Sequence, residues 1–406
     1  MAHPDRVAEA VLAWFAAKVP AKKHAPNEYT VLAAIVLEND GALDVLSVGS
    51  GTKCLGQSAL CPDGYLVHDG HAEVMCRRAF LRYLYYELSL RQSGVADETS
   101  IFTAANDDDG RIALKPSCSL HLYVSEAPCG DAALYDIKAD VLDEIHEAKV
   151  KRRKLHDADE VSTVPMRTTG AKVVESATHS HVRGLARVKS GRTDIPEANR
   201  TVSMSCTDKI CKWLSVGLQG SLLSQWFAPL HLASVVVSLD TQSDAKSFQE
   251  AIAQSLLRGN ATCTVATTTV TFPLTRSLAP STRTSASGLA LNWTHLRAEA
   301  PTAVALVDTK PDVEYLVSAR GLKMGTKKVL DLQIKQKMSS RLARRRFFAA
   351  AAQLDASLTD LAYDEAKRKQ VEYVAALSRF RAVDCFAAWK GVPGTAKRFT
   401  LACPLR

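Results

Sequence analysis

Residues 69–88, DGHAEVMCRRAFLRYLYYEL, carry the strongest helix pattern in the chain. Apolar residues recur at helical spacing from His71 to about Leu90 and place Val74 and Leu81 on one face. A helix with one apolar face packs that face against a core. We therefore expect a buried helix that begins at His71.

Short β-rich segments flank this helix in the sequence. The runs at 29–37 (YTVLAAIVL) and 45–48 predict two strands before it, and LHLYV at 120–124 predicts a third strand after it. A further helix is expected over 131–150. The order strand, strand, helix, strand, helix predicts an α/β fold in which helices pack on a central sheet.

The remaining segments are less regular. We expect helices over 1–19, about 207–218 and most of 329–381, and a strand over 233–239. Residues 151–198 are polar and weakly periodic, which is typical of a long insertion that is ordered only in part. Residues 243–287 are rich in Ser and Thr and contain β-like runs without a clear motif.

The composition limits the class of protein. The 406 residues are 47% hydrophobic and 23% charged, which excludes a disordered, collagen-like or coiled-coil chain. The longest apolar stretches, near 31–37 and 232–239, are far shorter than the roughly 20 residues that span a bilayer. Residues 1–19 hold Asp5 and Glu9 inside their apolar stripe, which is typical of an amphipathic helix and not of a signal peptide. We expect a protein of the nucleus, the cytoplasm or both.

The net charge of +8 is unevenly placed. Residues 301–406 contain 20 Lys and Arg against 10 Asp and Glu, so the first 300 residues carry a net charge of −2. This asymmetry favours an anionic partner, with nucleic acid the first candidate, although a solvated basic helix face would give the same count. The basic run at 151–154 has two similar interpretations, a nuclear targeting signal or solvated surface.

A metal site is indicated by three short motifs. His71-Ala72-Glu73 and Pro128-Cys129-Gly130 each stand where a helix is expected to start, and zinc deaminases use this pair of motifs. The imidazole and the thiolate bind zinc, helix dipoles favour the thiolate, and the glutamate moves protons. The common form of the motif has a second cysteine three residues after the first, but Ala132 stands there. Cys206, which opens another expected helix, is the best candidate for the third ligand.

Ordinary roles for these residues have to be considered as well. Ten cysteines in 406 residues are too few for a disulfide scaffold, and an isolated cysteine is usually a small buried hydrophobe. We assign that ordinary role to Cys54, Cys61, Cys76, Cys118, Cys211, Cys263, Cys385 and Cys403. His71 or Cys206 alone would also be more typical of structure than of catalysis. The three motifs in this order favour a zinc site.

Four segments resemble the adenosine deaminases that act on RNA. They are VGSGTKC (48–54), DGHAEVMCRRAFLRYLY (69–85), APCGDAALY (127–135) and SMSCTDKICKWLSVGLQGSLLS (203–224). Within that family, RTTGAKV (167–173) and RVKSGR (187–192) are most similar to the eukaryotic tRNA-specific adenosine deaminases, which form inosine at position 37 of alanine tRNA. The similarity is strong over about 29–90, 118–136 and 200–230, weaker over 315–400, and absent over much of 140–182 and 241–285.

The resemblance implies a fold and a domain organisation. The fold is a cytidine-deaminase-like central mixed sheet flanked by helices, with a large, mostly helical basic C-terminal extension. Residues 1–406 would form a single adenosine-to-inosine deaminase domain. Its core would span about 27–240 with an insertion at about 140–198, and a part that encloses an inositol phosphate would span about 290–406.

The family encloses an inositol hexakisphosphate in its core. Arg77 and Arg78 lie on or beside the apolar stripe of the expected helix, so their guanidinium groups need a buried partner. An internal anion would supply one. Neighbouring acidic side chains could also supply it, or both arginine side chains could extend to solvent. The resemblance implies that the inositol phosphate contacts Arg77, Arg78, Lys209, Lys212, Trp213, Gln219, Ser221, Tyr363, Lys367, Tyr373, Trp389, Lys390 and either Lys327 or Lys328. It also implies that Lys189 links this ligand to the metal site through Asp69.

The sequence departs from the family at several positions. His68 and Leu377 differ from the pattern at two inositol-phosphate contacts. In the loop that contains Gly191, editors of double-stranded RNA place a glutamate that fills the space left by the flipped base, whereas this chain has Arg192. An adenosine in an anticodon loop is already unpaired and does not need that wedge, so the difference favours tRNA.

The resemblance implies zinc-dependent hydrolytic deamination of adenosine to inosine. Water would attack adenine C6 while Glu73 moves protons, and Thr52, Lys53, Gly191 and Arg192 would contact RNA, although Thr52 and Lys53 also suit an ordinary turn. The substrate would be the anticodon stem-loop of tRNA, with no obligate protein partner. Two alternatives remain: a deaminase of free nucleosides or nucleotides, and a non-catalytic RNA-binding subunit with a structural zinc. The length and the basic C-terminal part argue against the first, and Glu73 argues against the second.

Overall fold

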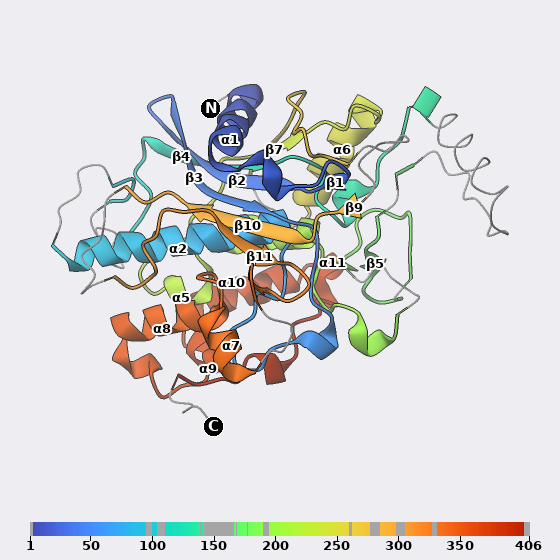
Figure 1. Cartoon of the computed structure of the whole chain (residues 1–406). Coiled ribbons are helices and arrows are strands. Elements are labelled where there is room, and N and C mark those ends of the chain that lie inside the picture. Colours follow the sequence, from blue (N-terminus) through green and yellow to red (C-terminus); the bar gives the residue numbers. More distant parts are fainter. Residues whose placement is uncertain are drawn as a thin grey trace.

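The computed structural model describes residues 3–94, 100–103, 110–138, 140–141, 166–167, 169–176, 178–189, 195–259, 262–276, 285–297, 305–326 and 331–401. A central sheet of eight strands organises this part of the chain, in the order β12-β11-β10-β3-β2-β4-β7-β8 (Figure 1). The strands are β2 (Leu32–Asn39), β3 (Ala42–Ser50), β4 (Cys118–Val124), β7 (Ser234–Ser238), β8 (Thr264–Thr268), β10 (Leu289–Thr294), β11 (Glu314–Val317) and β12 (Leu322–Lys323).

The sheet is mixed. Strands β4, β7 and β8 run parallel to one another, whereas the remaining neighbours pair antiparallel. Asp40 and Gly41 make the tight turn between β2 and β3, and both adopt positive φ (49° and 79°), as hairpin turns of this kind require. Two short pairs lie outside the sheet: β1 (Glu28–Tyr29) with β9 (Ser285–Ala286), and β5 (Lys172–Val173) with β6 (Arg187–Val188).

Helices cover both faces of the sheet. Alternate residues of β2 point to opposite sides: Ile35 packs in the same core cluster as α2 (Ala72–Gln92), and Ala34 in the cluster that includes α1 (Pro4–Lys18). Figure 1 shows α1 on one side of the sheet and α2 on the other, with the C-terminal helices beyond α2. Because both faces of β2 are covered, its residues 32–37 are all buried, which explains why they form a continuous apolar run in the sequence.

The remaining helices of the described part contribute no residue to the core cluster that contains α1. They are α4 (Cys206–Val216), α5 (Gly220–Leu223), α6 (Ala245–Leu256), α7 (Leu332–Lys337), α8 (Arg344–Leu354), α9 (Tyr363–Arg368), α10 (Val371–Arg381) and α11 (Asp384–Ala387). The short 3₁₀ turns are η1 (Ala21–Lys23), η2 (Gln57–Ala59), η3 (Asp131–Ala133), η4 (Glu197–Asn199), η6 (Ala356–Leu358) and η7 (Gly394–Ala396). Among the described residues, no helix combines the length and apolarity that crossing a membrane would need.

The expected fold class is confirmed: a central mixed sheet flanked by helices, with a helical C-terminal part. The helix expected over 131–150 is wrong for the residues described up to 138, because only η3 forms there. After η3, Asp136 forms a β-bridge with Met166, and Ile137 forms one with Ser243. This backbone therefore pairs with other segments and not with itself. Helix α6 falls in the stretch where no clear motif was found, and residues 151–165 lie outside the described part.

Candidate metal centre and active site

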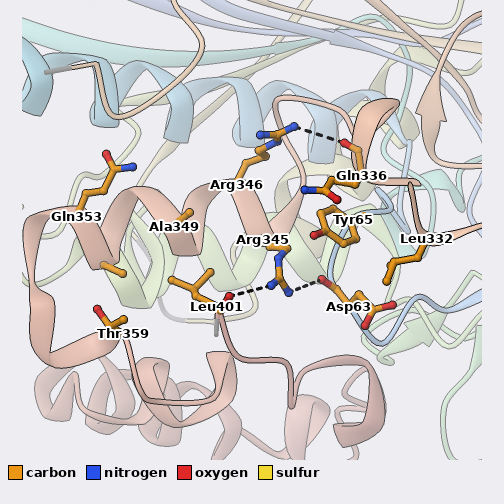
Figure 2. Close-up of a pocket in the computed structure, with 11 residues that line it drawn as sticks. Asp63, Tyr65, Leu332, Gln336, Arg345, Arg346, Ala349, Gln353, Thr359 and Leu401 are labelled. Carbon is orange, nitrogen blue, oxygen red and sulfur yellow. Dashed lines mark hydrogen bonds between the residues drawn. The ribbon is translucent and has the colours of Figure 1, made fainter. Parts of the chain in front are cut away.

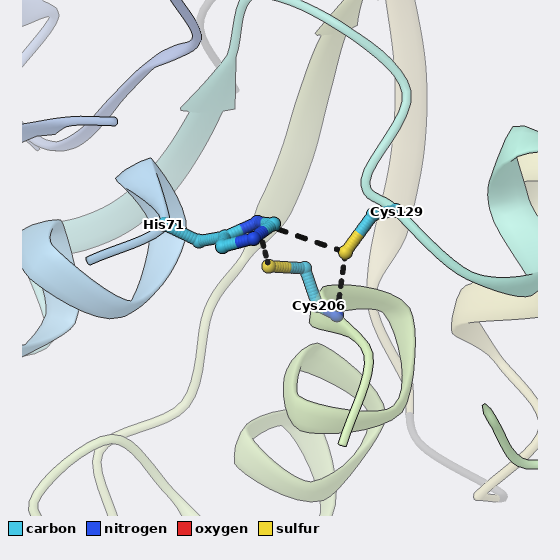
Figure 3. Close-up of side chains that lie close together, drawn as sticks. All are labelled: His71, Cys129 and Cys206. Carbon is cyan, nitrogen blue, oxygen red and sulfur yellow. Dashed lines mark hydrogen bonds between the residues drawn. The ribbon is translucent and has the colours of Figure 1, made fainter. Parts of the chain in front are cut away.

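The three motifs that suggested a metal site converge in the structure (Figure 3). His71 is the N-cap of α2, Cys129 lies in the loop after β4, and Cys206 is the first residue of α4. The Nδ1 atom of His71 lies 3.7 Å from Sγ of Cys129 and 3.6 Å from Sγ of Cys206. The three ligand atoms lie within 4.8 Å of one another.

Close packing at two glycines brings the loops together. A Cβ atom at Gly49 of β3 would meet the backbone of Cys76 at 2.3 Å, so only glycine lets the strand approach the first turn of α2 this closely. Gly130 adopts φ +113°, and a Cβ there would meet Oγ of Ser205 at 2.3 Å. Gly49 thus lets β3 pack closely against α2, and Gly130 lets the Cys129 loop touch the start of α4.

Cys129 therefore does not open a helix, contrary to the sequence-based expectation. The residues after it form η3, and Oγ1 of Thr207 donates to the carbonyl of Cys129 at 3.0 Å. The amide of Cys206 donates to Sγ of Cys129 at 3.4 Å, and α4 begins at this point. The positive end of α4, and not a helix of its own, faces the Cys129 sulfur.

The chemistry and spacing of this donor set fit zinc. Zinc binds one imidazole nitrogen at about 2.0 Å and two sulfurs at about 2.3 Å in a tetrahedron, which places neighbouring ligand atoms roughly 3.5 Å apart. The two nitrogen–sulfur distances agree with that spacing. Three protein ligands leave a fourth position for water, which is the arrangement of a catalytic zinc site and not of a structural one.

Glu73 lies beside this donor set without belonging to it. Its side chain is buried on the first turn of α2, and Sγ of Cys206 donates to its Oε2 at 3.0 Å. Burial, together with the negative charge of Cys129, raises the pKa of Glu73. A raised pKa makes a carboxyl group better suited to act as a general acid as well as a base.

Asp69 is the centre of a buried hydrogen-bond network at the back of the site. Lys189 donates to both of its oxygens at 2.9 and 3.0 Å, Ser203 donates at 2.6 Å, and Lys209 forms a further short ion pair with it. Burial opposes the charge of Asp69, but Lys189 and Lys209 hold its pKa well below the usual range. The predicted pairing of Lys189 with Asp69 is therefore observed.

Two further neighbours of Asp69 were not predicted. The amide of His71 donates to Oδ1 of Asp69 at 3.1 Å, so the aspartate fixes the backbone of a metal ligand. Cys54, assigned from the sequence to an ordinary buried role, donates from Sγ to the same oxygen at 3.0 Å. The GTKC turn that contains Thr52 and Lys53 is therefore anchored at the site. Gly191 and Arg192 lie outside the described residues.

A cluster of enclosed cations lies next to this network. Burial, with repulsion from Arg77, Lys367 and Lys209, lowers the pKa of Lys212 far below its usual value. No acidic side chain among the described residues forms an ion pair with Arg77, Lys212 or Lys367, and Nε of Arg77 is buried without a hydrogen-bond partner there. We refer to Arg77, Arg78, Lys212, Arg344, Lys367 and Lys397 as the cation cluster; these cations are coupled electrostatically.

Most predicted inositol-phosphate ligands that are described border this cluster. The charged group of each of three cations lies near the centre of an aromatic ring. The distances are 5.4 Å from Cζ of Arg77 to the Trp213 ring, 5.4 Å from Nζ of Lys212 to the Trp389 ring, and 5.5 Å from Nζ of Lys367 to the Tyr363 ring. Arg77 acts electrostatically on Tyr373, and Oγ of Ser221 donates to the carbonyl of Lys367 at 2.5 Å.

Some predicted ligands behave differently. The side-chain amide of Gln219 bonds to the backbone of Val216 and Leu230, and Lys390 is exposed. Lys327 and Lys328 lie outside the described residues, and Arg78 donates to the carbonyl of Leu342.

Sequence reasoning missed two members of the cluster. Arg344 begins α8, and its positive charge acts to lower the pKa values of Tyr363, Arg78 and His68. Lys397 has its pKa lowered to about 8 by burial and by repulsion from Lys367 and Arg344. The basic run at 344–346 at a helix start was a usable signal for Arg344, whereas nothing in the local sequence distinguishes Lys397.

A cavity of about 510 Å³ is lined by none of these groups (Figure 2). Its lining includes Tyr65, Gln336, Arg345 and Arg346, and it contains none of the predicted site residues. Arg345 lies over the Tyr65 ring and donates to the carbonyls of Asp63 and Leu401, so it closes one wall of the cavity. The candidate active site is consequently defined by the convergent motifs and not by this cavity.

Comparison with known proteins identifies the family. The model of the adenosine-deaminase (editase) domain matches residues 47–393, which include His71, Glu73, Cys129 and Cys206. The chain belongs to this family. The resemblance inferred from the sequence motifs is thereby confirmed.

The family includes relatives of two kinds. The chain is 34% identical to tRNA-specific adenosine deaminase 1 of Drosophila melanogaster over 252 residues, which cover 61% of this chain and 57% of the relative. It is 32% identical to the double-stranded RNA-specific editase Adar of the same organism, over 58% of this chain and 33% of the relative. It is 27% identical to human tRNA-specific adenosine deaminase 1, over 62% of this chain and 68% of that relative. The chain thus spans about half or less of the two fly relatives.

Proposed function

We propose that the protein is a zinc-dependent hydrolase that converts adenosine to inosine in tRNA, at position 37 next to the anticodon of alanine tRNA. The observation that carries this proposal is the meeting of His71, Cys129 and Cys206 around one point, with the carboxyl group of Glu73 beside them. Bound there, zinc would acidify a water molecule and so supply a nucleophile at neutral pH.

The side chains of this protein would carry out the proton transfers. The oxygen of water bonds to adenine C6, and the bond between C6 and the amino nitrogen breaks to release ammonia. Glu73 takes a proton from the water, delivers it to N1 of adenine and later protonates the leaving amino group. Asp69 accepts hydrogen bonds from the backbone amide of His71 and from the ammonium groups of Lys189 and Lys209, and thereby fixes these groups in position.

The choice of tRNA rests on two supports. Two of the relatives described above are tRNA-specific adenosine deaminases, and both align over about three fifths of this chain. Arg192 replaces the glutamate that editors of double-stranded RNA use as a wedge, and an anticodon loop already presents its adenosine unpaired. Gly191, Arg192, Thr52 and Lys53 would contact the RNA in this proposal.

We also assign a structural polyanion, inositol hexakisphosphate, to the cation cluster. These cations are half-buried, lie close to one another and have no acidic partners in the described part of the chain, so their mutual repulsion and partial desolvation destabilise the fold unless an anion compensates them. A polyphosphate would compensate Arg77, Lys212 and Lys367 together, and the tyrosines and tryptophans around them would enclose it. Lys189, together with Lys209, would connect the anion to Asp69 and so to the metal site.

Incubation of the purified protein with total tRNA, followed by mapping of inosine, tests the proposed function. We expect one modified adenosine, at position 37 of alanine tRNA. Turnover of free adenosine with no inosine in tRNA would instead support a nucleoside deaminase. RNA binding without any deamination by zinc-loaded protein would support a non-catalytic subunit.

A further inference from the structure

Each of the two cysteines of the site is followed, two residues later, by a buried aspartate. Asp131 stands two residues after Cys129, and Asp208 stands two residues after Cys206. Both carboxylates are buried, with at most 1% of either side chain exposed. Each therefore needs a buried counter-charge.

Two arginines supply that charge. The guanidinium group of Arg258 forms ion pairs with both aspartates and donates from Nε to the carbonyl of Ser255 at 2.9 Å, whereas Arg187 meets Asp131 with its side chain and Asp208 with its backbone amide. Nη2 of Arg258 lies 2.8 Å from Oδ1 of Asp208, and its Nε lies 3.9 Å from Oδ2 of Asp131. Nε of Arg187 lies 3.7 Å from Oδ1 of Asp131, while the backbone amide of Arg187 donates to Oδ2 of Asp208 at 2.9 Å. We refer to Arg187, Arg258, Asp131 and Asp208 as the buried quartet.

Further contacts anchor the quartet to both metal loops. Oγ of Ser205, the N-cap of α4, donates to Asp208 at 2.6 Å, and the amide of Ser205 donates to the carbonyl of Arg187 at 2.7 Å. Asp131 accepts hydrogen bonds from Ser255 at the end of α6 (3.0 Å) and from the amide of Gly184 (2.9 Å). Each aspartate, two residues after a cysteine ligand, is thus held by hydrogen bonds from other residues.

From this geometry we infer that Arg258 is a positioning residue for the metal: by holding Asp131 and Asp208 together, it sets the distance between the sulfurs of Cys129 and Cys206. This inference rests on the proposed zinc site. Arg258 does not contact the reacting atoms. A guanidinium group can contact two carboxylates at once, whereas a lysine ammonium on a flexible stem cannot hold both in one fixed geometry.

The expected consequence is faster loss of metal from a protein that still folds. Arg258→Lys keeps the charge, so neither aspartate is left without a buried cation, but it loses the double contact. Groups that orient metal ligands typically change metal affinity by about 10–100-fold when they are altered. We expect Arg258→Lys to release zinc to a colorimetric chelator at least about tenfold faster than the wild-type protein.

A matched control exists on the same face of the sheet but toward its opposite edge, at β10 and β11. Arg341 is also buried (4% of its side chain exposed, against 8% for Arg258) and also contacts two acids, Asp312 at 3.0 Å and Glu314 at 3.9 Å. Arg341→Lys should lower the thermal unfolding midpoint by a similar amount and yet release zinc at the wild-type rate. Asp131→Asn should accelerate release as Arg258→Lys does, and combining the two should add little, because both remove the same contact.

The outcomes separate this inference from the proposed function. Wild-type protein without bound zinc would overturn the zinc site and the inference together. Wild-type protein that holds zinc, with Arg258→Lys releasing it no faster, would overturn the inference alone. Equal acceleration in Arg341→Lys would also overturn it, because the effect would then reflect general destabilisation.

Discussion

The backbone amide of Cys206 donates a hydrogen bond to the sulfur of Cys129 at 3.4 Å, although 77 positions of sequence separate the two residues. This contact places the N-terminal end of α4 against the Cys129 sulfur, and His71 approaches both sulfurs from α2. It explains how a single cysteine after β4 can serve a metal site when Ala132 stands where a second cysteine is common.

Loss of either cysteine should abolish metal binding. We expect Cys129→Ala and Cys206→Ala to be purified without zinc, because two protein ligands hold the metal far less tightly than three. Cys211→Ala should retain one zinc per chain, since Sγ of Cys211 donates to the backbone carbonyl of Ser255 and does not belong to the set of three ligand atoms. Elemental analysis of the three proteins checks this. Metal loss in Cys211→Ala with retention in Cys206→Ala would refute the assigned third ligand.

Glu73 should be required for chemistry and not for structure. Glu73→Gln keeps the shape of the side chain but cannot exchange the proton, so we expect deamination to slow by at least about 100-fold. Zinc content and RNA affinity should stay at wild-type levels, because Glu73 lies outside the three-ligand set. Rates measured at saturating RNA, with zinc determined on the same sample, check this. Normal activity in a zinc-replete variant would remove Glu73 from the mechanism.

The cation cluster should make folding depend on a polyanion. Lys212→Glu or Arg78→Glu places a carboxylate among enclosed cations and competes with the anion, so we expect insoluble protein. Arg379→Glu, an exposed position on α10, should remain soluble. Denaturation of the wild-type protein should release inositol hexakisphosphate, detectable by mass spectrometry. Soluble, active protein without any releasable inositol phosphate would contradict this part of the account.

His121 should make stability depend on pH. It is fully buried between Ser234 and Glu38, and burial lowers the pKa of this histidine despite the opposing effect of Glu38. The unfolded chain therefore takes up the proton first as pH falls below 6.5, so acidification favours unfolding. The thermal midpoint of the wild-type protein should fall relative to that of His121→Gln between pH 7.5 and about 5.5. A difference that stays constant with pH would count against this.

Local sequence patterns predicted the elements whose signal is periodic. The α2 helix has a long apolar face, and β2 is a continuous apolar run, so both were predictable from spacing alone. The helix expected after Cys129 was wrong because Tyr135–Lys138 find backbone partners in segments around 166 and 242, which no local pattern reveals.

The site was only partly predictable for the same reason. His71, Glu73 and Cys129 stand in recognisable motifs, and Cys206 was identified by its place at the start of an expected helix. Arg258 reaches Asp208 across 50 positions of sequence and Lys397 acts on Lys367 across 30, so their roles appear only in the structure. Cys54 looked like an ordinary buried thiol until its contact with Asp69 was seen.

The central claim is that this chain deaminates an unpaired adenosine beside an anticodon. The most direct measurement compares single-turnover rates on an anticodon stem-loop of alanine tRNA with those on a long perfect duplex, using zinc-loaded wild-type protein and Glu73→Gln. The account predicts inosine at position 37 of the stem-loop with the wild-type protein, little or none in the duplex, and at least about a 100-fold slower reaction with Glu73→Gln. Equal rates on the two RNAs, or no inosine from zinc-loaded wild-type protein, would contradict it.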